Sequence, residues 1–219
     1  SNTGEAQASG GTLNVAHGQQ PSTIDPLVTT ATATAYTAKV IYESLLTLNE
    51  NYEVEPMLAE SYEVSEDGKT ITFKLRQGIK FHNGEEMDAD DVIASLNRWL
   101  DMSTIAKSSL VGPEWEKVDD ETVALHIEQP SSIALFVVAD QNQMAAIMPK
   151  DIVESAEATG VQEYIGTGPF KFVEWKTDQY IHYAKFEDYQ PRTEPASGLA
   201  GEKLALVDDL YWNFVDDES

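Results

Sequence analysis

The strongest constraint on the fold is a β-hairpin signal in SYEVSEDGKTITFKL, residues 61–75. Asp67-Gly68 supplies the residues that a tight turn requires, and the stretch TITFKL that follows alternates apolar with polar residues. The stretch DDETVALHIEQP, residues 119–130, repeats this alternation and ends at a proline. The sequence therefore predicts two strand pairs, at 61–75 and at 118–128.

Helical spacing is present elsewhere in the chain. In TATATAYTAKVIYESLLTL, residues 30–48, the spacing of the apolar residues predicts one amphipathic helix. Its expected core face consists of Tyr36, Val40, Ile41, Leu45 and Leu48. Further expected elements are a helix beginning near Pro149 and strands at 12–16, 170–175, 180–186 and in ALVDDLYWNFV near the end. This mixed order indicates an α/β protein.

The stretch IKFHNGEEMDADDV, residues 79–92, gathers one histidine and five carboxylates, which raises the question of a metal site. Asp88 is a suitable helix cap, and the two aspartates that follow it would lie in the first helical turn, where negative charge is favoured. Met87 and Val92 have the spacing of a hydrophobic staple. The run lacks calcium-loop spacing, and His82 has no second histidine nearby. We therefore interpret the run as the start of a helix that follows a turn.

Composition and motifs argue against several other functions. The chain has no cysteine, and its four histidines are scattered, so the sequence indicates no metal site and no cofactor. It contains no nucleophile elbow, Walker loop or dinucleotide fingerprint, so nothing in it indicates an enzyme. Asp and Glu outnumber Lys and Arg 38 to 14, and the net charge of -24 makes nucleic acid and anionic lipid unlikely partners. No stretch has the length and hydrophobicity of a membrane span.

Two blocks of sequence resemble one known family. The block MLAESYEVSEDGKTITFKLRQGIKFHNGEEMDADDVIASLNRW, residues 57–99, is similar to a signature of the extracellular solute-binding proteins that serve peptide and nickel ABC transporters, called family 5. The block IGTGPFKFVEWKTDQYIHYAKFEDYQ, residues 165–190, is similar to a second characteristic block of that family. The resemblance runs from about Gly11 to the end of the chain.

The resemblance implies a periplasmic-binding-protein-like fold of type II, in which a ligand is enclosed between two lobes. By this resemblance residues 1–11 form a flexible tether, residues 12–48 and 165–219 form part of the first lobe, and residues 49–164 form an inserted smaller α+β domain. Family members are much longer than this chain, so a fragment of such a protein is expected. One lobe alone is expected to bind ligand weakly.

The implied function is that of the substrate-binding component of an ABC importer. Such a protein captures di- or oligopeptides, or a related small solute, and delivers the ligand to the permease. The resemblance places it outside the cytoplasm, in the periplasm or as a cell-surface lipoprotein whose signal segment has been removed. Contact with the membrane would then be made only through a lipid anchor or the permease.

The resemblance also indicates ligand contacts, in the loop after the first strand and at the edge of the inserted domain that faces the cleft. The nearest matches in this sequence are Gln19, Gln20, Tyr36, Gln141 and Asn142. An alternative function is a peptide-sensing or chaperone-like surface protein that uses the same fold without transport. A hydrolase is a third hypothesis, against which stands the missing nucleophile motif.

Overall fold

The structure is a computed structural model that describes residues 10–215. The tether expected at 1–11 lies almost entirely outside this range; Gly10 and Gly11 form backbone hydrogen bonds with residues 206–209. In chain order the elements are β1 (Thr12–His17), α1 (Thr32–Ile41), β2 (Leu46–Leu48), β3 (Val54–Pro56), β4 (Ala59–Val64), β5 (Thr70–Leu75), α2 (Ala89–Met102), α3 (Thr104–Ser109), β6 (Glu114–Asp119), β7 (Thr122–His126), α4 (Ala134–Ala139), α5 (Lys150–Glu154), β8 (Phe170–Lys176), β9 (Tyr180–Lys185) and β10 (Asp209–Phe214). The mixed α/β class is confirmed.

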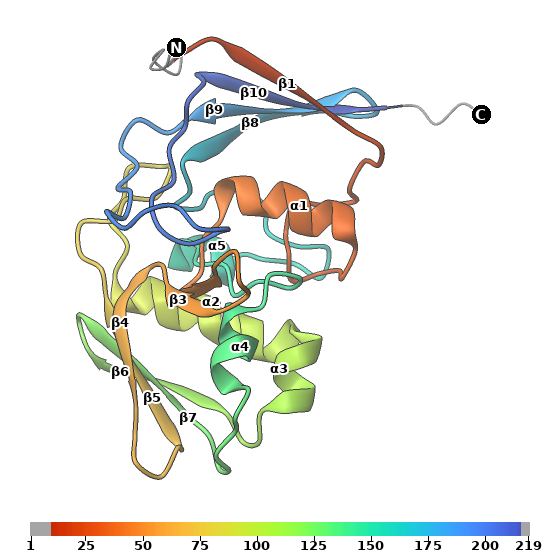
Figure 1. Ribbon diagram of the computed structural model, residues 1–219. Coiled ribbons are helices and arrows are strands. Elements are labelled where there is room, and N and C mark those ends of the chain that lie inside the picture. Colours follow the sequence, from red (N-terminus) through yellow and green to blue (C-terminus); the bar gives the residue numbers. More distant parts are fainter. Residues whose placement is uncertain (1–9, 216–219) are drawn as a thin grey trace.

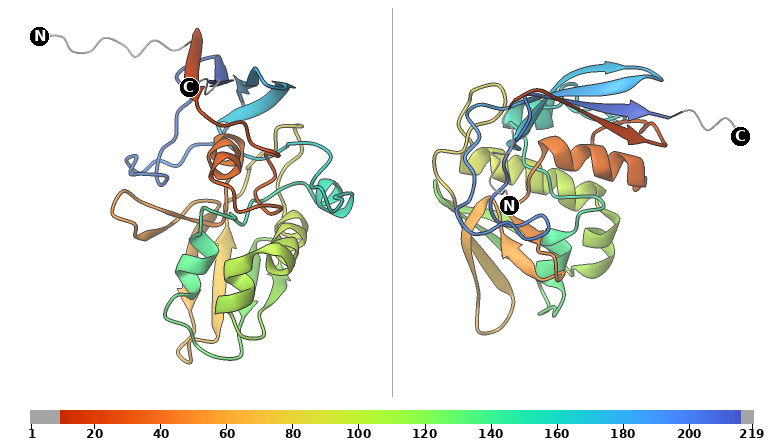
Figure 2. Two further views of the ribbon diagram at one scale, coloured as in Figure 1. Left: turned by 90° about the vertical axis from the view of Figure 1, so that its right-hand side faces the viewer. Right: turned by 45° about the horizontal axis from the view of Figure 1, so that its top comes forward.

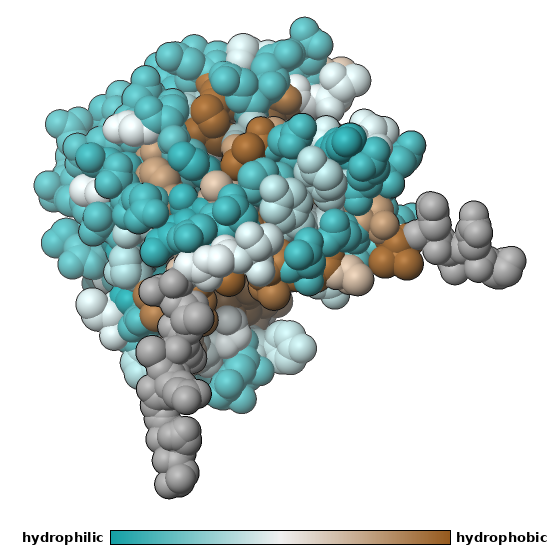
Figure 3. All heavy atoms as spheres, turned by 90° about the horizontal axis from the view of Figure 1, so that it is seen from above, coloured by the Kyte–Doolittle hydropathy of each residue, from teal (hydrophilic) through white to brown (hydrophobic). Residues whose placement is uncertain are grey.

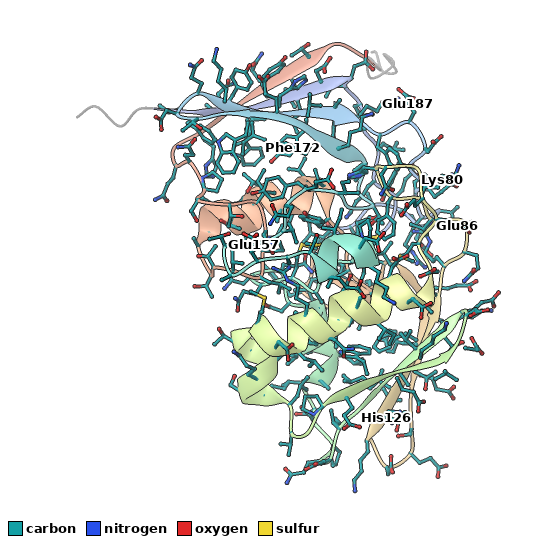
Figure 4. The ribbon with its side chains drawn as sticks, turned by 180° about the vertical axis from the view of Figure 1, so that it is seen from behind. Lys80, Glu86, His126, Glu157, Phe172 and Glu187 are labelled. Atoms are coloured by element: carbon teal, nitrogen blue, oxygen red, sulfur yellow. The ribbon has the colours of Figure 1, made fainter. Side chains whose placement is uncertain are left out.

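The upper sheet joins the two ends of the chain. Its strand order is β1-β10-β9-β8, and β1 runs parallel to β10 while the other pairs are antiparallel. The first strand therefore shares a sheet with the region after residue 165. Helix α1 lies beneath this sheet (Figure 1), and Ile181, Tyr183 and Leu210 are buried with residues of α1 in one hydrophobic cluster. Seen from behind, Phe172 points from β8 into the space above α1 (Figure 4).

The outer face of the upper sheet is mainly polar. His182 Nε2 lies 2.8 Å from Asp209 Oδ1, and the His182 ring stacks on Tyr211 with the two centroids 4.3 Å apart. Seen from above, hydrophilic residues cover most of the molecule and hydrophobic residues form small separate groups (Figure 3). The hydrophobic side of this sheet is therefore the side that faces α1.

The lower sheet contains both predicted hairpins. Its order is β4-β5-β7-β6, entirely antiparallel, and Gly68 in the β4–β5 turn has φ +71°. Helix α2 packs on this sheet, and Trp99 of α2 lies 6.4 Å from Trp115 of β6 between ring centroids. A second hydrophobic cluster fills this region, so the chain has one core beneath each large sheet. The division at residues 49 and 164 remains a proposal.

Helix α1 differs from the prediction in its length and in its buried face. It ends at Ile41, Leu48 belongs to β2, and Tyr36 is 49% exposed. The buried face consists of alanine and threonine residues together with Ile41, which was predicted to be in the core. The threonines can be buried because the Thr34 and Thr37 hydroxyl groups donate to the Thr23 and Ala33 carbonyl oxygens. A threonine whose hydroxyl is bonded to backbone can be buried at low cost.

The end of α1 is set by residues far away in the sequence. Gly168 N donates to Ile41 O at 2.9 Å, and a Cβ on Gly166 or Gly168 would collide with the backbone of Ile41. Neither has a positive φ, so what they provide is close approach between two backbone segments.

The acidic run starts α2, as the sequence predicted. Asp91 N donates to Asp88 Oδ1 at 2.9 Å, and Asp88 N donates to Asp91 Oδ2 at 3.0 Å, which is a reciprocal capping box. Met87 and Val92 on either side of the cap are buried in the lower core. Most of the acidic run therefore has a structural role.

Replacing Asp88 by alanine is expected to lower the free energy of unfolding by about 0.5–2 kcal/mol, because the Asp91 amide at the helix start loses its hydrogen-bond acceptor. Urea denaturation measures the change. Asp90→Ala is the matched control, because Asp90 lies in the same turn and contacts only the exposed Lys117, an interaction worth about 0–1 kcal/mol. Equal losses in both variants would contradict the capping role.

Candidate functional site

Aromatic and charged side chains connect the end of β1 with α1. The His17 ring lies 5.2 Å from the Trp212 ring and 5.9 Å from the Tyr36 ring, measured between centroids. Lys39, one helical turn after Tyr36, places its Nζ 5.3 Å from the centre of the Tyr36 ring. His17, Tyr36 and Lys39 therefore form a continuous row.

The row continues toward the segment between β9 and β10. Lys39, Glu43, Gln141 and Lys203 share the wall of a depression of about 10 Å³. The left view of Figure 2 looks along α1 and shows the β2–β3 hairpin and the segment 187–208 projecting on the same side of this helix. We call His17, Tyr36, Lys39, Gln141 and Lys203 the α1 surface.

A buried carboxylate fixes one end of the α1 surface. The Glu43 side chain is 1% exposed and accepts hydrogen bonds from Thr167 Oγ1 at 3.0 Å, Tyr189 Oη at 2.8 Å and Lys203 Nζ at 3.3 Å. Burial, and secondly the charge of Glu43, raise the pKa of Tyr189 well above its usual value, so this hydroxyl stays a donor. Glu43 thereby holds the segment around Lys203 against the end of α1.

Lys39 has a different environment. Its side chain is partly buried, and burial lowers the pKa of Lys39 from its usual value while the charge of Asp140 partly offsets the effect. Within residues 10–215, no carboxylate oxygen lies within 4.0 Å of Lys39 Nζ. The α1 surface therefore contains a partly desolvated cation without an ion-pair partner.

The residues proposed as ligand contacts lie in two groups. Tyr36 and Gln141 are on the α1 surface, although Gln141 Nε2 donates to Ala139 O at 2.7 Å. Asn142 is exposed in the same loop as Gln141, and exposed Gln19 follows His17, whose ring nitrogen lies 3.2 Å from Gln19 O. These four remain candidates for contact with a ligand.

Gln20 has a visible structural role. Its Oε1 accepts from Trp175 Nε1 at 2.9 Å and from Asp178 N at 2.8 Å, and its Nε2 donates to Asp178 Oδ1 at 3.0 Å. The side chain is thus engaged in fixing the β8–β9 turn. A ligand contact by Gln20 would have to replace one of these bonds.

Sequence reasoning missed three members of the α1 surface, namely His17, Lys39 and Lys203. Lys39 could have been found, since it lies three residues after Tyr36 on a predicted helix and so shares its face. Lys203 could not, because its partner Glu43 is 160 residues away. His17 directly follows a predicted strand but carries no motif.

Other parts of the described surface are weaker candidates for a ligand or metal site than the α1 surface. A concavity of about 620 Å³ lies between α2, α3 and β6, far larger than the depression on the α1 surface, but it is an open groove of mixed polarity. In the described part of the chain, no group of three His, Cys, Asp or Glu residues could hold a metal ion. Figure 4 shows His126 at the far end of the lower sheet, away from the α1 surface. Among the described helices, none has the length and hydrophobicity to cross a membrane.

Comparison with known proteins identifies the family. The family model described as bacterial extracellular solute-binding proteins, family 5 Middle, matches residues 53–219. The glutathione-binding protein of Escherichia coli (strain K12) is 33% identical over 209 residues, which is 94% of this chain and 38% of that protein.

Solved structures show the same relationship. The PBP AgaA from A. tumefaciens R10, solved with agropinic acid, is similar with a TM-score of 0.78 and 32% identity over 94% of this chain and 40% of the other. The DppA periplasmic binding protein of Helicobacter pylori, solved with the peptide STSA, has a TM-score of 0.79 and 26% identity over 95% of this chain and 43% of the other.

The chain belongs to the bacterial extracellular solute-binding proteins of family 5, a family of binding proteins rather than enzymes. It spans about two fifths of the length of the relatives named above.

Proposed function

We propose that this chain supplies one wall of the ligand site in the substrate-binding component of an ABC importer. The ligand is a di- or oligopeptide or a related small solute, and the wall is the α1 surface. The observation that carries this proposal is the continuous row from His17 to Lys203, which offers aromatic faces, an amide and cations on one side of a rigid helix. Family membership supports it, as does the glutathione-binding relative.

The shape of the α1 surface explains why a second wall is needed. Its depression of about 10 Å³ cannot enclose a solute, whereas small-molecule sites usually hold about 300–1,000 Å³. A second lobe that closes over the surface would expel water and strengthen each polar contact. Capture would take place outside the cytoplasm, and the closed complex would then be recognised by the permease.

The test is an NMR titration of this chain with a set of tripeptides Ala-Xaa-Ala. We expect saturable chemical-shift changes at the α1 surface with a dissociation constant of about 1 mM, which corresponds to about -4 kcal/mol. Tyr36→Ala should weaken binding. Tyr52→Ala is the control, because Tyr52 is 77% exposed between β2 and β3 and lies outside the row. Shifts confined to the groove between α2, α3 and β6, or no saturable shift anywhere, would contradict the proposal.

A further inference from the structure

We infer that the solute bound on the α1 surface is anionic, and that its carboxylate pairs with Lys39. This inference rests on the proposed function and specifies the class of ligand. It starts from the distribution of charge. The chain has 38 acidic and 14 basic residues. Among residues 10–215, most of the partly buried cations have a carboxylate or carbonyl partner, whereas Lys39 has no carboxylate oxygen within 4.0 Å in that range.

The two lysines at the depression differ in how their charges are balanced. Lys203 Nζ lies 3.3 Å from the buried Glu43 carboxylate, so its charge already has a counter-ion. Lys39 Nζ lies over the face of Tyr36, 5.3 Å from the ring centre. The charge of Asp140 raises the pKa of Lys39, but its carboxylate is too far away for an ion pair. An incoming carboxylate therefore gains more at Lys39 than at Lys203.

Burial makes Lys39 suited to this role. A partly desolvated ammonium group lacks some of its water, so a charge-assisted hydrogen bond to a carboxylate replaces less hydration than it would at an exposed lysine. The lowered pKa of Lys39 reflects the same desolvation, and an anion beside it would reverse that shift. Tyr36 and Gln141 lie on either side of Lys39 and can contact the neutral part of the solute.

The net charge of -24 makes the inference testable, because it opposes anion binding in general. If no local cation took part, a peptide with a free carboxylate would bind more weakly than the same peptide with an amidated C-terminus. A preference for the carboxylate therefore requires a local positive group.

The experiment repeats the NMR titration with two matched probes, the Ala-Xaa-Ala set with free carboxylates and the same set amidated at the C-terminus. We expect the carboxylate set to bind about tenfold more tightly. Lys39→Gln should reduce this ratio to one or less, because the net charge of -24 then opposes binding of the carboxylate. Lys185→Gln should leave it unchanged, because Lys185 is also partly buried without a carboxylate within 4.0 Å but lies at the opposite end of the upper sheet from His17.

The outcomes separate the two proposals. Equal binding of both sets by the unaltered chain would overturn the inference and leave the proposed function standing, and so would a preference that survives in Lys39→Gln. Failure of both sets to bind the α1 surface would overturn the proposed function and the inference with it.

Discussion

Replacing Asp25 by alanine is expected to lower the free energy of unfolding by about 3–5 kcal/mol, because it leaves a buried guanidinium group without its counter-charge. Arg98 Nη2 donates to Asp25 Oδ2 at 2.6 Å and Arg98 Nη1 donates to Asp25 Oδ1 at 3.2 Å. The Asp25 side chain is 0% exposed and that of Arg98 is 9% exposed. Because both charged groups are buried, each needs the other to compensate for the loss of its hydration.

Asp25 also connects three segments of the chain. Its carboxylate accepts hydrogen bonds from Leu27 N at 3.1 Å and Val161 N at 3.0 Å, in addition to the pair with Arg98 of α2. The variant would therefore disturb the loop before α1, the helix α2 and the segment that precedes β8. A buried backbone amide that loses its acceptor adds to the cost.

Urea denaturation of four variants tests this role: Asp25→Ala, Lys74→Ala, Arg98→Met and the double variant. Lys74→Ala breaks the exposed pair with Glu60, in which both side chains are 57% exposed, and should cost at most about 1 kcal/mol. Arg98→Met, alone and combined with Asp25→Ala, completes a double-mutant cycle, and the double variant should be less destabilised than the sum of the single variants. Additive losses, or a loss for Asp25→Ala as small as that for Lys74→Ala, would show that the buried pair is not coupled.

Sequence patterns predicted those features of the fold that depend on residues close together in the chain. The hairpin turn at Gly68 and the capping box of Asp88 depend on residues within a few positions of one another, so the sequence displays them. Hydrophobicity correctly assigned Ile41 to the buried face of α1, but it wrongly assigned Tyr36 to that face. The hydroxyl groups of Thr34 and Thr37 could not be recognised as internally bonded without the folded backbone.

The candidate site was less predictable, because long-range contacts assemble it. Lys39 and Gln141, which share the wall of the depression, come from segments far apart in the sequence, and they lie together because the chain after α4 passes beside α1. The hydrogen bond from Lys203 to Glu43 could not be predicted from any sequence motif. What the sequence could supply was the family resemblance, which named Tyr36 and Gln141 as candidate ligand contacts but not Lys39.

A second large effect is expected from His82, which lies partly buried between the start of the acidic run and the segment before β8. Its Nδ1 accepts from Gly166 N at 3.2 Å, so Nε2 carries the proton and donates to Gly168 O at 3.0 Å. The ring also lies 4.8 Å from that of Phe186. Burial is the main cause that lowers the pKa of His82 from 6.5 to about 4, because the charged ring would have little water around it. In the charged ring Nδ1 would also carry a proton, and this proton would face the Gly166 amide donor rather than an acceptor.

The sign of the pH effect follows from this shift. Between pH 6.5 and about 4 the unfolded chain binds a proton at His82 while the folded chain does not, so the contribution of His82 to stability is complete above pH 6.5 and is lost as the pH falls toward 4. The loss over this range is about 3 kcal/mol. Asp91 acts in the opposite direction, because burial raises its pKa to about 6 and its folded form gains a proton in the same range. Since Asp91 is only partly buried, solvent screening reduces its effect.

Comparison with variants isolates the contribution of His82 from that of Asp91. His82→Gln is expected to be less stable than the unaltered chain at neutral pH, and this difference should shrink by about 2–3 kcal/mol between about pH 7 and about pH 4.5. Asp91→Asn is the matched control. As the pH falls, the stability of the unaltered chain relative to this variant should increase, since only the unaltered chain gains from protonating Asp91. Urea denaturation across this range gives both differences. A difference for His82→Gln that stays constant with pH would show that the imidazole is protonated as easily in the folded chain as in the unfolded one, and that its bonds to Gly166 and Gly168 do not require the neutral ring.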